Sequence, residues 1–173
     1  MSQSTKQIKT ITIGELNRRA SDIHKFIETS EQQYADKIKA AADTIAQCHS
    51  EKPLVLLSGP SGSGKTSTAY RIASELTAKG IKAVVISMDD YFVPGMIPPD
   101  ENGKVDLEAP ARVDCELLKK DLRTLASGGE VQLPKFNFTD NSRRCGNKVR
   151  CDGNTVVIIE GIHALNPDVT GRM

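Results

Sequence analysis

The feature that most constrains the fold is a glycine-rich segment between an apolar run and an amphipathic stretch. Residues 59–66 match the pattern G-x-x-x-x-G-K-[ST] at every defined position. The preceding run, residues 54–57, is short and continuously apolar, which is typical of a strand buried in a parallel sheet. Apolar residues then recur at helical spacing: Ala69, Ile72, Ala73 and Leu76. A strand, a glycine-rich turn and a helix in this order predict an α/β fold with a parallel sheet.

Each residue type in the glycine-rich segment suits the binding of phosphate. Glycines let the backbone adopt positive φ angles and approach a ligand closely. The amides of the turn and the start of the following helix attract an anion, Lys65 would reach the β- and γ-phosphates of ATP, and Thr66 would bind Mg²⁺. A chance match is on the order of one per cent, and the G-x-x-G-x-G spacing disfavours a dinucleotide-binding turn. The expected phosphate-binding residues are Gly59, Pro60, Ser61, Gly62, Ser63, Gly64, Lys65, Thr66 and Ser67.

The remaining elements are predicted from periodicity and from turn residues. Residues 11–16 are typical of either a short strand or the start of a helix. We expect a helix at residues 31–48 and an amphipathic helix at residues 116–126. Two further buried strands are expected at residues 83–86 and 155–159. Residues 94–110 are interpreted as an ordered loop, and residues 131–150 as a hairpin-like insertion. Composition changes near Pro53, so residues 1–50 are interpreted as an N-terminal helical extension or linker and residues 51–173 as the domain that carries the glycine-rich segment.

Composition excludes some classes of protein. The 23 basic side chains nearly balance the 22 acidic ones, and Trp is absent, so neither a basic surface nor stacking platforms for nucleic acid are expected. The four cysteines lack a C-x-x-C pair and are predicted to be free thiols. The apolar runs are all shorter than the roughly 20 residues of a membrane span, and no signal-peptide pattern occurs at the start. A cytoplasmic protein without a membrane partner is expected.

Acidic residues follow two of the predicted strands. Asp89 and Asp90 come directly after the second strand, and Glu160 ends the third. Ligands of parallel sheets bind beyond the carboxyl ends of the strands, where the glycine-rich turn also lies. A carboxylate there can accept a proton from an attacking hydroxyl or bind Mg²⁺, although a helix cap or a solvated turn is the alternative for each residue. His163 is interpreted as structural.

The order of several motifs resembles the uridine kinase and phosphoribulokinase family of P-loop kinases. The similar segments are residues 59–66, 87–92, 108–110, 134–143 and 159–162. The sequence is most similar to the uridine kinase-like domain of bacterial nucleoside kinases. This resemblance implies a parallel sheet flanked by helices, ATP and Mg²⁺, and transfer of a phosphoryl group to the 5′-hydroxyl of a uridine- or cytidine-like nucleoside.

The resemblance also implies roles for individual residues. Asp89 matches the catalytic base and Lys65 the catalytic lysine, while Thr66, Glu160 and Asp89 match metal positions. Glu108 stands where the family usually has an Asp that holds the ribose hydroxyls. Phe136 and Asn141 replace a Tyr and a His that read the uracil edge, and Phe138 keeps a ring that can stack on a base. The implied substrate-binding residues are Glu108, Phe136, Phe138, Asn141 and Arg143.

Members of the family continue beyond the position of Glu160 with further strands, a lid that carries arginines and an adenine-contacting segment. The resemblance therefore implies that residues 51–173 are the N-terminal two-thirds of a P-loop kinase domain, truncated before the lid, incomplete at the C-terminus and weak in turnover. Alternatives left open are a kinase of the same fold for pantothenate or a sugar phosphate, and a non-catalytic nucleotide-binding module. A GTPase is disfavoured because no N-K-x-D motif occurs. The expected partner is a small-molecule substrate, and a homo-oligomer is left open.

Overall fold

The computed structural model describes residues 10–95, 99, 101, 103, 104, 106 and 108–171. Contacts divide the chain into a first unit that ends at Lys37 and a second that begins at Ile38. Helix α1 (Ile13–Ala20) lies in the first unit, so the helix was the correct alternative for residues 11–16. Helix α2 (Ile23–Cys48) starts earlier than the predicted residue 31. The domain boundary after residue 50 stays a prediction.

A parallel sheet of three strands forms the centre of the second unit. Its strands are β1 (Leu54–Leu57), β2 (Lys82–Ser87) and β5 (Thr155–Glu160), in the order β1-β5-β2. Both outer strands run parallel to β5. The predicted α/β architecture with a parallel sheet is therefore confirmed, and the last of its three strands in the sequence is the central one.

Burial differs among the three strands. Every residue of β5 is buried, as its continuous apolar run predicts. The prediction that β1 is buried on both faces was wrong, because all four of its residues are only partly buried. Strand β2 buries Ile86 while its other residues are partly or fully exposed. Both strands are edges of the sheet within the described part of the chain, which explains their greater exposure.

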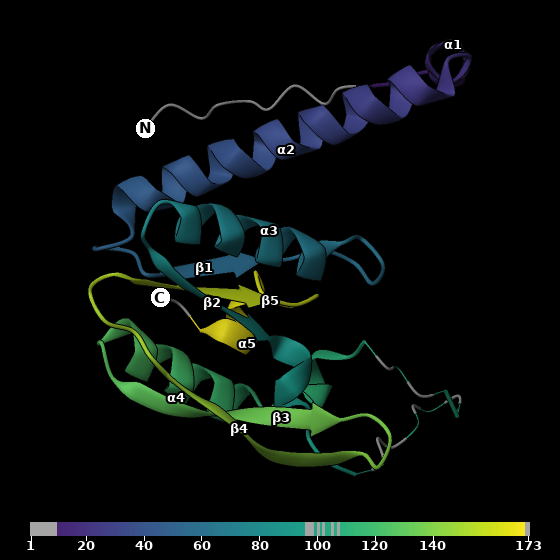
Figure 1. Cartoon of the computed structure of the whole chain (residues 1–173). Helices are drawn as coiled ribbons and strands as arrows, with labels where there is room; N and C mark the ends of the chain where they lie inside the picture. The colour runs from purple at the N-terminus through teal and green to yellow at the C-terminus, as the bar shows by residue number, and fades with distance from the viewer. Residues whose placement is uncertain are drawn as a thin grey trace. The chain divides into compact units, whose positions relative to one another are not determined.

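Helices cover the two faces of this sheet (Figure 1). Helix α3 (Lys65–Ala78) buries Ala69, Ile72, Ala73 and Leu76, the stripe that the sequence predicts. Helix α4 (Cys115–Ala126) lies on the opposite side of the sheet and buries three leucines of its predicted stripe. The main apolar core joins these leucines to Val157 and Ile159 of β5. The helix-sheet-helix arrangement thus follows from the apolar faces of the elements.

The predicted hairpin consists of β3 (Glu130–Asn137) and β4 (Ser142–Arg150), which pair antiparallel. Short helical turns connect the larger elements: η1 (Met88–Tyr91), η2 (Pro110–Arg112) and α5 (Pro167–Thr170). The predicted ordered loop at 94–110 lies partly outside the described residues. All four cysteines are free thiols, as expected. Among the described helices, none has the length and apolar composition required to cross a lipid bilayer.

Candidate functional site

The loop between β1 and α3 has the winding that its glycines predict. Gly62 and Gly64 have φ angles of 74° and 79°, a left-handed conformation that glycine adopts without strain. Gly64 is the N-cap of α3, and no side chain caps this helix. A Cβ atom on Gly59 would lie 2.6 Å from the Ser63 hydroxyl, so the loop closes tightly at that point. An uncapped helix start beside such a loop fits a phosphate group.

The ends of the three strands are level with one another. Leu57 at the end of β1 and Ser87 at the end of β2 both pair in register with Glu160 of β5. The segment that follows β1 is also tied to the segment that follows β5, because the Ser58 hydroxyl donates a 2.8 Å hydrogen bond to the Ile162 carbonyl. The loop between β1 and α3, which contains residues 59–64 and is called the phosphate loop below, therefore lies with η1 and Glu160 at the carboxyl-terminal edge of the sheet.

Asp89 lies in η1, directly after β2, and lines a cleft of about 290 Å³. Lys65, Phe92 and Glu108 line the same cleft. Burial raises the pKa of the Asp89 carboxyl above its ordinary 3.8, and the negative charge of Glu160 raises it further, whereas Lys65 lowers it. A half-buried carboxyl group with a raised pKa is a suitable acceptor for the proton of a hydroxyl group.

Glu160 is the residue that best fits a metal ion. Its side chain is only 2% exposed, and its Oε2 atom is buried without a hydrogen-bond partner, which is costly for a carboxylate. Thr66 and Glu160 line a second cleft of about 350 Å³. Within the described ranges, no three His, Cys, Asp or Glu side chains gather as a metal-binding group. The buried Glu160 carboxylate, which shares a cleft with Thr66, suits Mg²⁺, because this ion usually takes one or two protein carboxylates and completes its shell with water and phosphate oxygens.

Asp90, the neighbour of Asp89, is engaged by the hairpin. Its carboxylate accepts hydrogen bonds from the Lys135 ammonium group at 3.1 Å and from the Phe136 amide at 3.2 Å. These two contacts hold strand β3 against η1, the turn that carries Asp89. The two adjacent aspartates thus differ in environment, since Asp89 lines the cleft beside Lys65 while Asp90 is held by β3.

Glu108 is the implied substrate-binding residue that lies in the cleft of Asp89. The Ser61 hydroxyl of the phosphate loop donates a 2.7 Å hydrogen bond to Oε1 of Glu108. His163 lies in the same cleft, and its Nε2 atom is 2.6 Å from the Glu108 carbonyl oxygen. A carboxylate at this position can accept hydrogen bonds from the hydroxyl groups of a ligand.

Two of the implied base-binding residues belong to an aromatic cluster. Phe136 and Phe138 of the hairpin make edge-to-face contacts with each other, with ring centroids 5.1 Å apart. Both also contact Phe92, at 5.7 and 6.1 Å, and Phe92 lines the cleft of Asp89. Phe136 is buried, whereas Phe138 is 65% exposed and can offer a face to a ligand.

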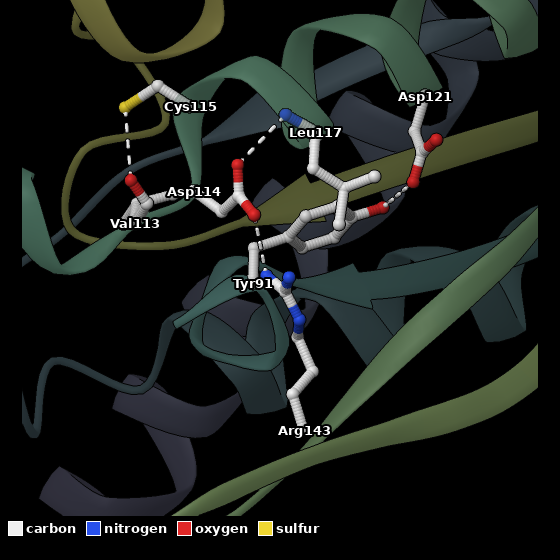
Figure 2. A network of polar contacts seen from close by, with 7 residues as sticks. All are labelled: Tyr91, Val113, Asp114, Cys115, Leu117, Asp121 and Arg143. Atoms are coloured by element: carbon white, nitrogen blue, oxygen red, sulfur yellow. Dashed lines mark hydrogen bonds and ion pairs between the residues drawn. The ribbon is translucent and has the colours of Figure 1, made fainter. Parts of the chain in front are cut away.

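The other two implied substrate-binding residues make contacts within the protein. The Asn141 side-chain amide donates a 2.6 Å hydrogen bond to the Gly95 carbonyl. Arg143 forms a 2.8 Å ion pair with Asp114, whose carboxylate also caps α4 by accepting from the Leu117 amide (Figure 2). Neither residue lines the cleft of Asp89, and their contact with a substrate stays a prediction.

A buried pair anchors the turn that carries Asp89. The Tyr91 hydroxyl donates a 3.0 Å hydrogen bond to Asp121 of α4, as Figure 2 shows, and both residues are buried. Burial is the main cause that raises the pKa of Tyr91 and the pKa of Asp121. The sequence analysis missed this pair. The only signal for it in the sequence was the position of Asp121, an acidic residue three positions after Leu118 on the apolar stripe of α4.

Comparisons of the sequence with those of known proteins found a matching family. The sequence model of the phosphoribulokinase / uridine kinase family matches residues 54–169. Uridine-cytidine kinase C of Dictyostelium discoideum is 36% identical over 116 residues, which cover 67% of this chain and 24% of that protein. Uridine kinase of Lactobacillus helveticus is 29% identical over 126 residues, which cover 71% of this chain and 59% of that protein. The chain thus spans less than two thirds of either relative.

The fold is shared with a solved structure described as that of a possible uridine kinase from Bacillus stearothermophilus. The match has a TM-score of 0.59 at 24% sequence identity and covers 73% of this chain and 70% of that chain. The family match extends over the phosphate loop, η1, the hairpin and β5, and it includes more than half of the sequence. The chain belongs to the phosphoribulokinase / uridine kinase family.

Proposed function

We propose that this chain is the part of an ATP- and Mg²⁺-dependent kinase that binds the ATP phosphates and activates an alcohol acceptor. The observation that carries the proposal is the shared cleft of Lys65, Asp89 and Glu108, at the sheet edge where the phosphate loop begins. A phosphate loop alone indicates only nucleotide binding. A proton acceptor and a hydroxyl-binding carboxylate beside it support phosphoryl transfer to an alcohol.

In this reaction the acceptor hydroxyl attacks the γ-phosphorus of ATP. The new bond joins the acceptor oxygen to phosphorus, the bond from phosphorus to the bridging oxygen of ADP breaks, and Asp89 takes the proton. The amides at the start of α3 and the Lys65 ammonium group would bind the phosphates. Thr66 and Glu160 would hold Mg²⁺, which when bound offsets charge on the phosphate oxygens.

The proposed acceptor is the 5′-hydroxyl of a uridine- or cytidine-like nucleoside. The curated relatives named above support it, as does the exposed ring of Phe138 beside the cleft. A second candidate is another small alcohol, such as pantothenate or a sugar phosphate. It is favoured by the Asn141 amide, which bonds to Gly95, and by the apolar side chain of Phe136.

The test is a screen for ADP release by the full-length gene product with MgATP. Nucleosides, pantothenate and sugar phosphates are each added as acceptor, and a reaction without acceptor measures background hydrolysis. The proposal predicts acceptor-dependent ADP release that is largest with uridine or cytidine. Release with another alcohol alone would select the second candidate. No acceptor-dependent release with any compound would refute the kinase assignment.

A further inference from the structure

His163 lies in the cleft of Asp89 but has no part in the proposed chemistry. It follows the fully buried strand β5 and lines the cleft together with Lys65 and Glu108. Its Nε2 atom is 2.6 Å from the Glu108 carbonyl oxygen. A carbonyl oxygen can only accept a hydrogen bond, so Nε2 carries the proton and donates it. The ring nitrogen that faces Glu108 is therefore a donor and not a base.

Glu108 is held at two points by segments distant in the sequence. His163 binds its backbone carbonyl, and the Ser61 hydroxyl binds its carboxylate. A further hydrogen bond to a described residue is local, from the Glu108 amide to the Asp106 carboxylate at 2.9 Å. Because β5 is the central strand of the sheet, the residues at its end have a fixed place relative to Asp89. Through its hydrogen bond to the Glu108 carbonyl, His163 fixes the position of the loop that carries Glu108 relative to the end of β5.

We propose that His163 is a positioning residue for the acceptor alcohol. By holding the Glu108 carbonyl, it keeps the Glu108 carboxylate in the cleft, where that group accepts hydrogen bonds from acceptor hydroxyls beside the one that reacts. A hydroxyl group misplaced by about 1 Å loses much of its reactivity. The inference rests on the proposed function for the identity of the ligand, while the contact itself belongs to the folded chain.

The kinetic test compares His163→Ala with His163→Gln in the full-length protein. Loss of one neutral hydrogen bond predicts a three- to tenfold rise, roughly, in the acceptor KM of His163→Ala, with the KM for ATP unchanged. Gln carries an amide N–H that can donate to the same carbonyl, so His163→Gln retains most of the acceptor affinity. An equal rise in the KM for ATP, or no rise in the acceptor KM, overturns the proposal.

A matched control is His49→Ala. The His49 ring contacts the Ala46 carbonyl at 2.8 Å, so it makes the same kind of bond, but it lines a different pocket from that of Asp89. This variant is expected to leave both KM values unchanged. If the acceptor KM of His49→Ala rises as much as that of His163→Ala, the effect comes from a general loss of rigidity in the fold, and the proposal is overturned.

Hydrogen exchange tests the same contact without turnover. The amides of Ala109 and Arg112 bond to carbonyls of the Glu108 loop, and they are expected to exchange faster in His163→Ala and at the wild-type rate in His163→Gln. Unchanged exchange in His163→Ala overturns the inference. If the wild-type protein releases no ADP with any acceptor, the proposed function fails, and the exchange rates still decide whether His163 holds the loop.

Discussion

At the scale of single residues, the site brings two carboxyl groups of like charge to one edge of the sheet. The Asp89 pKa is raised by burial and by the negative charge of Glu160. At a pH above this raised pKa, Asp89 is ionised in the folded protein, and its charge lowers the free energy of unfolding. The cost shrinks as the pH falls from the raised pKa to the ordinary value of 3.8, and it is gone below 3.8, because the carboxyl group is then protonated in both the folded and the unfolded state. The group that would act as the base thus lowers the stability of the fold at neutral pH.

The variant Asp89→Asn is therefore expected to be more stable than the wild type at pH 7. Its amide is neutral at every pH, so its advantage in melting temperature should shrink as the pH is lowered towards 4. Thermal unfolding across this range measures the effect. The variant Glu101→Gln, which changes an exposed carboxyl group, is the control. An advantage of Asp89→Asn that does not depend on pH would contradict the account.

Activity should respond to the same group with the opposite sign. Asp89 must be ionised to accept a proton, so kcat/KM is expected to fall when the pH drops below its raised pKa. The acid limb of the pH profile should therefore lie above 3.8, the ordinary value for Asp. A profile of acceptor-dependent ADP release against pH checks this. An acid limb at or below 3.8 would show that another group, or an unperturbed one, is the base.

At the scale of elements, the phosphate loop depends on the backbone conformation of Gly64. No atom lies within 4 Å of a Cβ built on Gly64, so the variant Gly64→Ala is strained only by its φ angle of 79°. The expected cost is about 1–2 kcal/mol of stability, together with weaker ATP binding. Gly153→Ala, a site with equal space and no positive φ, is the control. Equal effects in urea unfolding would contradict this interpretation.

The turn η1 depends on the buried pair of Tyr91 and Asp121. The variant Tyr91→Phe leaves the Asp121 carboxylate without this hydrogen bond, at an expected cost of about 1–3 kcal/mol. The double variant with Asp121→Leu should cost less than the sum of the single changes, because neither polar group then remains buried alone. Urea unfolding measures the cycle, with exposed Tyr70→Phe as the control. Additive costs would show that the pair does not couple η1 to α4.

Local elements could be predicted from the sequence, whereas contacts between distant segments could not. The stripe of Ala69 and Leu76 on α3 follows from helical periodicity, and the buried run of β5 from its apolar residues. The order β1-β5-β2 and the bond from His163 to Glu108 depend on which segments meet in space. Periodicity within one element carries no information about its partner, so the sequence alone could not predict that His163 contacts Glu108.

At the scale of the whole molecule, the sheet brings together candidate site residues that are separated by about 100 residues in the sequence. The register places the end of β1, the end of β2 and Glu160 at one level, so the phosphate loop, Asp89 and the metal-binding candidates become neighbours. Motif order could suggest this arrangement, because parallel strands all end on the same side. The part of the site that is proposed to bind the acceptor depends on loops and on the hairpin, where the sequence is less informative.

The most direct test of the central claim is a paired measurement on Asp89→Asn in the full-length protein. Acceptor-dependent ADP release and equilibrium binding of MgATP are measured for the variant and for the wild type. The account predicts that release falls by about 10²- to 10⁴-fold, the usual contribution of a general base, while MgATP binding is retained. Release that persists at the wild-type rate would show that Asp89 is not the base and would contradict the account.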